Sequence, residues 1–101
     1  MARVALLCPD LLFGSKLQGA LWAAGHEPVG AGEDADVLVV DLTDEPDARI
    51  AQAADAGVPR LAFYSHVEQD VRRRAEEAGF ERVVPRSRMA REAAALVESL
   101  L

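Results

Sequence analysis

Hydrophobic and polar residues alternate in blocks along this chain, and the blocks predict strands and helices in turn. Three short apolar runs, at residues 4–8, 37–40 and 58–64, are typical of strands buried on both faces of a parallel sheet. Pro59 lies at the start of the third run, where its missing N–H costs little. Two briefer runs, at residues 28–29 and 83–84, bring the number of predicted strands to about five.

Helical spacing of apolar residues fills most of the segments between these runs. Apolar residues recur at intervals of three and four within residues 11–24, 50–54, 71–78 and 89–100. Gly25, Gly57 and Gly79 follow the first three segments, where a left-handed C-cap favours glycine. Thr43 and Ser87 are placed to cap the second and the last helix. The pattern therefore predicts four helices.

Strands that alternate with helices across short connections indicate an α/β fold with right-handed crossovers. We expect a three-layer α/β/α sandwich around a five-stranded parallel sheet. Almost nothing separates the second strand from the third, so the helix expected there is shortened or missing. A length of 101 residues suits one hydrophobic core, and we expect one domain over residues 1–101.

Charge and cysteine content narrow the classes of partner and compartment. The net charge of −6 repels a phosphate backbone, so direct binding to nucleic acid is not expected. Cys8 is the one cysteine, so it forms no internal disulfide, and a reducing compartment fits. The apolar run at residues 4–8 is too short for a signal peptide or a membrane span. We expect a cytoplasmic protein without membrane contact.

Polar side chains follow four of the predicted strands. Asp10 follows the first strand, Asp41 the third, Ser65 the fourth and Arg86 the fifth. In open parallel sheets such residues gather at the carboxyl edge, and we expect them to line one crevice. Carboxylates suit Mg²⁺, a hydroxyl and a cation hold phosphoryl oxygens, and an aspartate can accept a phosphoryl group.

By order and position, three segments resemble receiver domains of two-component response regulators, and the resemblance spans nearly the whole chain. They are DVLVVDL at 36–42, VPRLAFYS at 58–65 and GFERVVPR at 79–86. The resemblance implies a flavodoxin-like sheet in the order 2-1-3-4-5 and a signalling module with no enzymatic activity of its own. Its partner would be a sensor kinase or a downstream regulator. It also implies a homodimer through the face formed by the helix at 71–78, the strand at 83–84 and the last helix.

The same resemblance assigns roles to individual residues. Asp41 takes the place of the phosphoacceptor, and Ser65 that of the hydroxyl that switches inward in active receivers. Asp10, Asp41 and the backbone carbonyl of Thr43 would hold Mg²⁺. Arg86 stands where the family has a lysine, and a planar guanidinium does not reproduce a compact ammonium.

Several departures favour an atypical receiver or a pseudo-receiver that works as a stand-alone module. Receivers usually carry adjacent acidic residues after the first strand, whereas this chain has only Asp10 there. The second helix is missing as well, and Pro85 alters the strand before Arg86. Simpler structural roles also fit: Asp41 as the polar end of a buried strand, Asp10 as a helix cap, Ser65 as a turn residue and Arg86 as a surface ion-pair partner.

Other residues offer further alternatives. Cysteine at the end of a first strand also resembles the phosphocysteine of phosphotransferase-system B domains, but a bulky loop and a neighbouring acid favour a structural Cys8. His26 and His66 are expected to face solvent. The apolar trio at residues 11–13 lies at the rim of the crevice, where two roles are open: covering the site or binding a partner, and core packing, which is favoured. The competing function is a small flavodoxin-like domain that binds an anionic metabolite or takes part in phosphoryl transfer.

Overall fold

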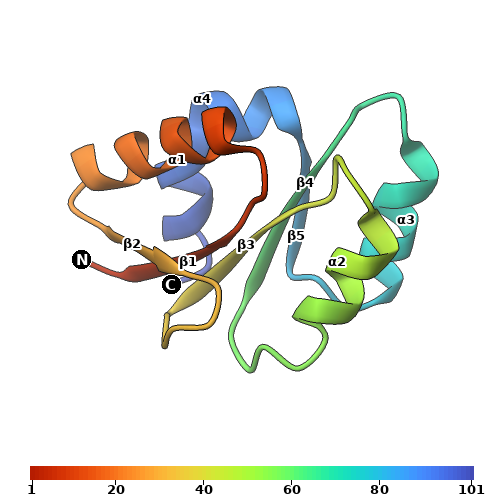
Figure 1. The fold of residues 1–101 in the computed structure, drawn as a ribbon, viewed down its shortest axis with the longest axis horizontal. Helices are drawn as coiled ribbons and strands as arrows, with labels where there is room; N and C mark the ends of the chain where they lie inside the picture. Colours follow the sequence, from red (N-terminus) through yellow and green to blue (C-terminus); the bar gives the residue numbers. More distant parts are fainter.

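The computed structural model describes all residues from 1 to 101 and contains five strands and four helices that alternate along the chain (Figure 1). The strands are β1 (Arg3–Leu7), β2 (Glu27–Gly30), β3 (Val37–Asp41), β4 (Arg60–Tyr64) and β5 (Arg82–Pro85). The helices are α1 (Leu11–Ala23), α2 (Pro46–Ala53), α3 (Gln69–Glu77) and α4 (Arg86–Glu98). None of these helices is long and apolar enough to cross a membrane.

The strands form one sheet in the order β2-β1-β3-β4-β5, and every neighbouring pair is parallel. This is the predicted flavodoxin-like topology, so the fold class and the strand order are confirmed. The register sets Leu7 beside Val40 and Asp41 beside Phe63. The carboxyl ends of β1, β3 and β4 therefore meet at one edge of the sheet.

Two hydrophobic clusters fill the two faces of the sheet. One cluster joins α1 and α4 to the strands through Leu17, Leu21, Met89 and Val97 together with strand residues such as Val39. The other joins α2 and α3 to the opposite face of the strands, and its largest member is the fully buried Tyr64. Valine and leucine at alternate strand positions supply both clusters, as expected for a sheet buried on both sides.

The crossover from β2 to β3 carries no helix. Residues 31–36 form a short loop instead, so the predicted loss of the second helix is confirmed. Every other crossover lays a helix on the sheet. As Figure 1 shows, no helix covers the part of the sheet between the β2–β3 loop and α2.

The structure corrects the two predicted helix caps, Thr43 for α2 and Ser87 for α4. Thr43 does not cap α2, because the N-cap is Glu45, which adopts a left-handed backbone with a φ of 47°. Ser87 does not cap α4, because that helix begins at Arg86, directly after β5, with Pro85 as its N-cap. Neither helix has a side-chain cap hydrogen bond, and Pro46 lies in the first turn of α2, where its missing N–H costs little.

Three expectations about exposure were also wrong. His26 is buried, and its ring bonds to the Ala2 backbone N–H at 3.2 Å and to Glu98 Oε2 at 2.8 Å. Leu11 and Leu12 are exposed instead of lying in the core, since they occupy the outer side of the first turn of α1. Only Phe13 of that trio is buried.

Candidate functional site

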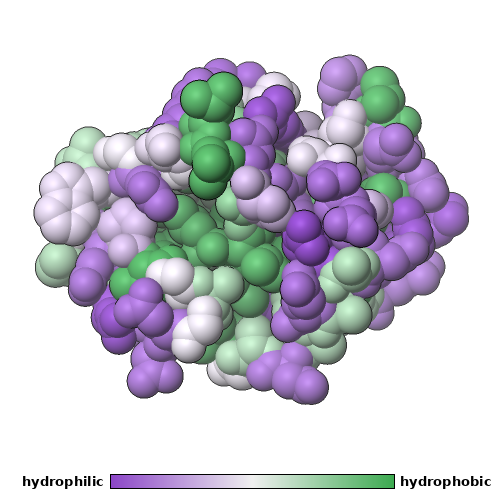
Figure 2. Space-filling view, in the orientation of Figure 1, coloured by the Kyte–Doolittle hydropathy of each residue, from purple (hydrophilic) through white to green (hydrophobic).

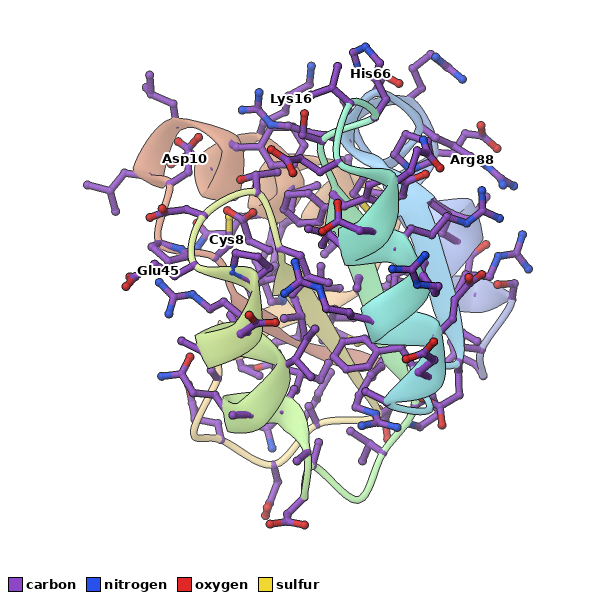
Figure 3. All side chains as sticks on the ribbon, turned by 90° about the vertical axis from the view of Figure 1, so that its right-hand side faces the viewer. Cys8, Asp10, Lys16, Glu45, His66 and Arg88 are labelled. Carbon is purple, nitrogen blue, oxygen red and sulfur yellow. The ribbon has the colours of Figure 1, made fainter.

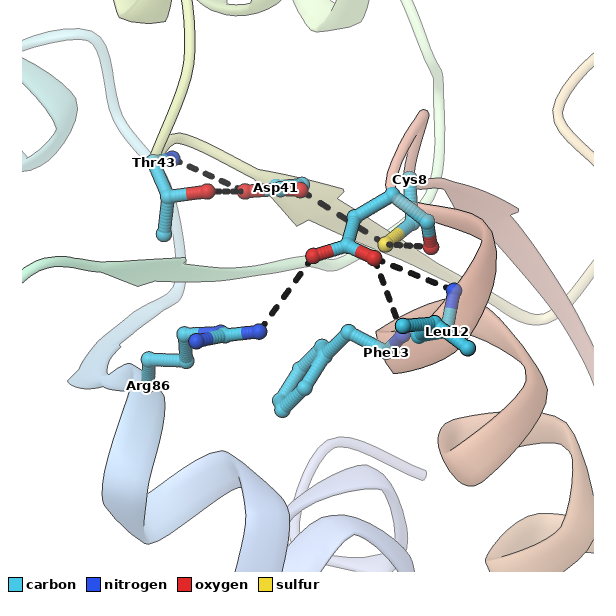
Figure 4. A network of polar contacts seen from close by, with 7 residues as sticks. Cys8, Leu12, Phe13, Asp41, Thr43 and Arg86 are labelled. Carbon is cyan, nitrogen blue, oxygen red and sulfur yellow. Dashed lines mark hydrogen bonds and ion pairs between the residues drawn. The ribbon is translucent and has the colours of Figure 1, made fainter.

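The carboxyl edge of the sheet brings together most of the predicted site residues. Asp41 is the last residue of β3, and Ser65 directly follows β4. Asp10 is the N-cap of α1, and Arg86 is the first residue of α4. Figure 4 shows that Asp41, Cys8, Thr43 and Arg86 converge from different elements on one small region.

Asp41 is buried, with 2% of its surface exposed, and its own loop holds its carboxylate. Oδ1 accepts hydrogen bonds from the backbone N–H of Thr43 at 2.8 Å and from the Thr43 hydroxyl at 2.5 Å. This is the turn that aspartate favours after a strand, because the side chain bonds to the backbone two residues on. Thr43 thus contacts Asp41 through its N–H and hydroxyl, whereas the resemblance predicted a role for its carbonyl.

The second oxygen of Asp41 faces Cys8. The thiol Sγ lies 3.6 Å from Asp41 Oδ2 and 3.7 Å from the backbone carbonyl oxygen of Asp10. Burial, followed by the charge of Asp41 and its hydrogen bond, raises the pKa of Cys8 to about 11. The thiol therefore stays protonated at neutral pH and donates to Asp41, which opposes a phosphocysteine role.

This contact was missed by sequence reasoning, although the strand register holds the signal for it. Leu7 pairs with Val40, so the residues that follow them, Cys8 and Asp41, lie side by side. Two polar residues at the carboxyl ends of adjacent parallel strands can therefore be expected to contact each other.

Asp10 and Arg86 form a second pair. Asp10 Oδ1 accepts hydrogen bonds from the backbone N–H groups of Leu12 and Phe13, both at 3.1 Å, and so caps α1. Asp10 Oδ2 lies 3.3 Å from Arg86 Nη2. The guanidinium of Arg86 also lies over the Phe13 ring, 4.3 Å from its centroid. Asp10 thus caps a helix and Arg86 forms a surface ion pair, which are the simpler structural roles weighed for these two residues.

These residues do not fit a resident magnesium ion. Mg²⁺ requires several oxygen ligands in near-octahedral geometry. Asp10 is occupied by the helix cap and by a guanidinium cation, and Asp41 is occupied by Thr43 and Cys8. No group of three histidine, cysteine, aspartate or glutamate side chains converges anywhere in the structure. The predicted set of Asp10, Asp41 and Thr43 is therefore not assembled as a metal site.

A cleft of about 680 Å³ opens beside this region. Its lining combines two cations, three hydroxyls, a histidine and two apolar residues: Lys16, Arg86, Thr43, Ser65, Ser87, His66, Phe13 and Ala90. Figure 3 shows Lys16 and His66 near each other at the same end of the molecule as Asp10. Sequence reasoning missed Lys16, because it lies inside a helix and follows no strand. Cations and hydroxyls give the cleft the chemistry of an anion site.

Comparisons with known proteins find similarity in structure alone. No protein-family model matches the chain, and no curated protein sequence matches it. A response regulator from Thermotoga maritima superposes with a TM-score of 0.77 at 13% identity, covering 97% of this chain and 95% of that one. The receiver domain of a Francisella response regulator gives a TM-score of 0.82 at 11% identity, covering 99% and 96%.

A third solved structure is a response regulator from Burkholderia pseudomallei that holds a phosphorylated aspartic acid, a calcium ion and citrate. It superposes with a TM-score of 0.71 at 12% identity, covering 98% of this chain and 72% of that one. The chain therefore has the fold of receiver domains over nearly its whole length. At these identities the likeness concerns the fold, and what the site does has to be argued from its own residues.

Proposed function

We propose that this chain is an atypical receiver-like regulatory module that acts through contacts with other proteins. The observation that carries the proposal is a receiver fold in which Asp41 keeps the acceptor position while Thr43 and Cys8 engage both of its oxygens. The edge offers no set of nucleophile, base and orienting group for an enzyme. A sensor kinase or a downstream regulator is the proposed partner, and the reduced thiol of Cys8 suits the cytoplasm.

Phosphorylation of Asp41 is the finer part of this proposal, and the geometry favours Oδ2 as the accepting oxygen. Oδ1 holds two short hydrogen bonds from Thr43, whereas Oδ2 holds only a thiol contact at 3.6 Å. Oδ2 would attack the phosphorus of a phosphohistidine or a small acyl phosphate. The donor's P–N or P–O bond breaks as the new P–O bond forms, and the leaving group takes the electron pair. The added negative charge would lie beside Thr43, which lines the cleft that also holds Lys16 and Arg86.

Thermal unfolding with beryllofluoride, a mimic of the phosphoryl group, tests this proposal. The wild type, Asp41→Asn and the control Asp44→Asn are each measured alone, with magnesium chloride, and with magnesium chloride plus beryllofluoride. At a hundredfold excess over its Kd, a ligand of the native state adds about 2.7 kcal/mol of stability. This corresponds to a rise in Tm on the order of 10 °C.

The rise is expected in the wild type and in Asp44→Asn, because Asp44 is exposed and forms no ion pair. It is not expected in Asp41→Asn. Unchanged Tm values in all three proteins would refute phosphorylation at Asp41 and leave a module that works through its surface alone. Magnesium chloride by itself is expected to shift none of them, because the donor set does not fit the ion.

Exposed apolar side chains support a protein partner at this edge. Leu11 is 83% exposed and Leu12 is 88% exposed, and both directly follow Asp10. Large exposed apolar residues close to a site indicate contact with another molecule. The double variant Leu11→Ser/Leu12→Ser is therefore expected to weaken transfer from a cognate kinase while leaving the beryllofluoride response intact.

Homodimerisation remains part of the proposal, through the face of α3, β5 and α4. That face carries charges of both signs, including the pairs Arg72–Glu76 and Arg88–Glu92. Such a mixed surface is self-complementary, as a two-fold interface requires. Sedimentation velocity over a range of concentrations should show a dimer that high salt dissociates, and a monomer at every concentration would contradict it.

Binding of an anionic metabolite is the second candidate function, and the cationic cleft favours it. Lys16, Arg86 and the hydroxyl of Ser65 can receive a phosphate or carboxylate group without any bond to Asp41. Inorganic phosphate and citrate are suitable probes in the same thermal assay. Stabilisation that is lost in Lys16→Gln/Arg86→Gln but kept in Asp41→Asn would favour this function over phosphorylation.

A further inference from the structure

A second hollow lies on the sheet itself, away from the cationic cleft. It has a volume of about 390 Å³ and opens on the face covered elsewhere by α2 and α3, between the β2–β3 loop and the end of α2. Strand and loop residues that are mostly apolar form its floor, among them Ala5, Ala35, Leu38 and Val58. Figure 2 shows hydrophobic atoms in the middle of this face, with hydrophilic residues on both sides. We call this hollow the open-face groove.

The open-face groove exists because the β2–β3 crossover lacks a helix. In a doubly wound sheet each crossover helix covers the strands that it connects. Here a loop of residues 31–36 replaces that helix, and the small side chain of Ala5 leaves the floor low. Ala5 and Leu38 are buried at the bottom of the hollow, and the half-buried side chains of Ala35, Ala56 and Val58 give it the apolar character against which a helix packs.

The rim of the groove is acidic. Asp34 and Asp55 line it and form no ion pair in the structure, and no lysine or arginine lines it. Glu33, the third acidic residue of the rim, pairs with Arg3 at 3.7 Å and accepts the N–H of Gly30 at 2.8 Å. Two carboxylates without an ion-pair partner, next to an apolar floor, favour a ligand that presents both a positive charge and an apolar surface.

We propose that the open-face groove binds an amphipathic helix of a partner protein, with alanine and leucine on the buried side and lysine or arginine beside it. The helix takes the place of the missing crossover helix, and its cations meet Asp34 and Asp55. A second copy of this chain does not fit face to face, because the two acidic rims would repel each other. The inference rests on the proposed role of the chain as a protein-contact module, and it names the chemistry of one partner.

The test uses two synthetic helical peptides, one of leucine, alanine and lysine and one in which glutamate replaces each lysine. Binding is measured by calorimetry and mapped by amide chemical shifts. The lysine peptide is expected to bind, to shift the amides of Ala35 and Val58, and to weaken with added salt. The charge reversal Asp34→Lys/Asp55→Lys should weaken binding by about tenfold or more.

The matched control is Asp44→Lys/Glu68→Lys, which makes the same charge change at exposed acids outside the groove that also lack an ion pair. It should bind the lysine peptide as the wild type does. Equal loss in both double variants would show attraction by net charge alone and overturn the proposal. So would no binding, equal binding of the glutamate peptide, or shifts confined to other surfaces. None of these results alters the beryllofluoride response of Asp41, so the two proposals fail separately.

Discussion

Replacing Asp41 with asparagine is expected to make Cys8 markedly more reactive. In the wild type the pKa of Cys8 is raised from its ordinary value of 9.0 to about 11. Burial is the largest cause, and the charge of Asp41 and its hydrogen bond follow. A shift of two units leaves about one hundredth of the thiolate that an unfolded chain has at neutral pH. Thiolate is the reactive form, so alkylation should slow by about the same factor.

Asp41→Asn removes the negative charge and weakens the acceptor, while burial of the thiol remains. We therefore expect recovery of only part of the shift, with alkylation about tenfold faster than in the wild type. Iodoacetamide labelling at constant pH, followed by intact-protein mass spectrometry, gives the rate, and labelling in urea gives the unfolded reference. Asp10→Asn is the matched control, because the charge of Asp10 has the smallest effect on the Cys8 pKa and asparagine can still cap α1.

The outcomes separate clearly. If folded Asp41→Asn reacts at the wild-type rate, the contact of Cys8 with Asp41 does not control the thiol, and the reasoning is wrong. If Asp10→Asn accelerates labelling as much as Asp41→Asn does, a general loss of negative charge explains the effect. Circular dichroism of each variant confirms that a fast rate comes from a folded chain.

Three further predictions concern stability. Because the Cys8 pKa is raised on folding, the stability that it contributes is complete below about pH 9 and is lost towards about pH 11. The loss has an upper bound of about 2–3 kcal/mol, and partial exposure of the thiol makes it smaller than that bound. Urea unfolding of the wild type and of Cys8→Ala at pH 9 and at pH 11 measures it, because Cys8→Ala lacks this part of the loss. His26→Ala should cost about 2–3 kcal/mol in urea unfolding, since it leaves a cavity and an unpaired Ala2 N–H, whereas His66→Ala at an exposed position should cost little. Glu45→Gly should raise the free energy of unfolding by about 0.5–1 kcal/mol in the same assay, because glycine adopts the left-handed backbone without strain. A variant less stable than the wild type would contradict this.

Much of the fold was predictable because it depends on local patterns. Buried parallel strands appear as continuous apolar runs, and helices on a sheet as apolar residues three and four apart. The missing helix was predictable from spacing alone, since residues 31–36 are too few for one. The starts of α2 and α4 were harder to predict. These helices begin at Pro46 and Arg86 without a side-chain cap, although Thr43 and Ser87 are residue types that commonly cap helices.

The site was predictable in its place but not in its contacts. Topology brings Asp10, Asp41, Ser65 and Arg86 to one edge, and the sequence holds that information. Which partner each side chain takes depends on distances between elements that no local pattern encodes. Arg86 bonds to Asp10, which is 76 positions away in the sequence, and His26 bonds to Glu98, which is 72 positions away. Pairings of this kind follow from the packed tertiary structure.

The carboxyl edge and the open-face groove give this small chain two surfaces with opposite electrostatics. The edge combines Asp41 with the cations of the cleft and suits a phosphoryl group or another anion, whereas the groove has an apolar floor with Asp34 and Asp55 at its rim. Opposite charge lets the two surfaces select different partners, because a cationic helix that fits the groove is repelled by the cleft. Asp34→Lys/Asp55→Lys should therefore weaken binding of the helix and keep the beryllofluoride response, whereas Asp41→Asn should keep binding of the helix and lose the beryllofluoride response. A variant pair that lost both responses together would mean that the two surfaces are coupled through β3, which runs from the floor of the groove to Asp41.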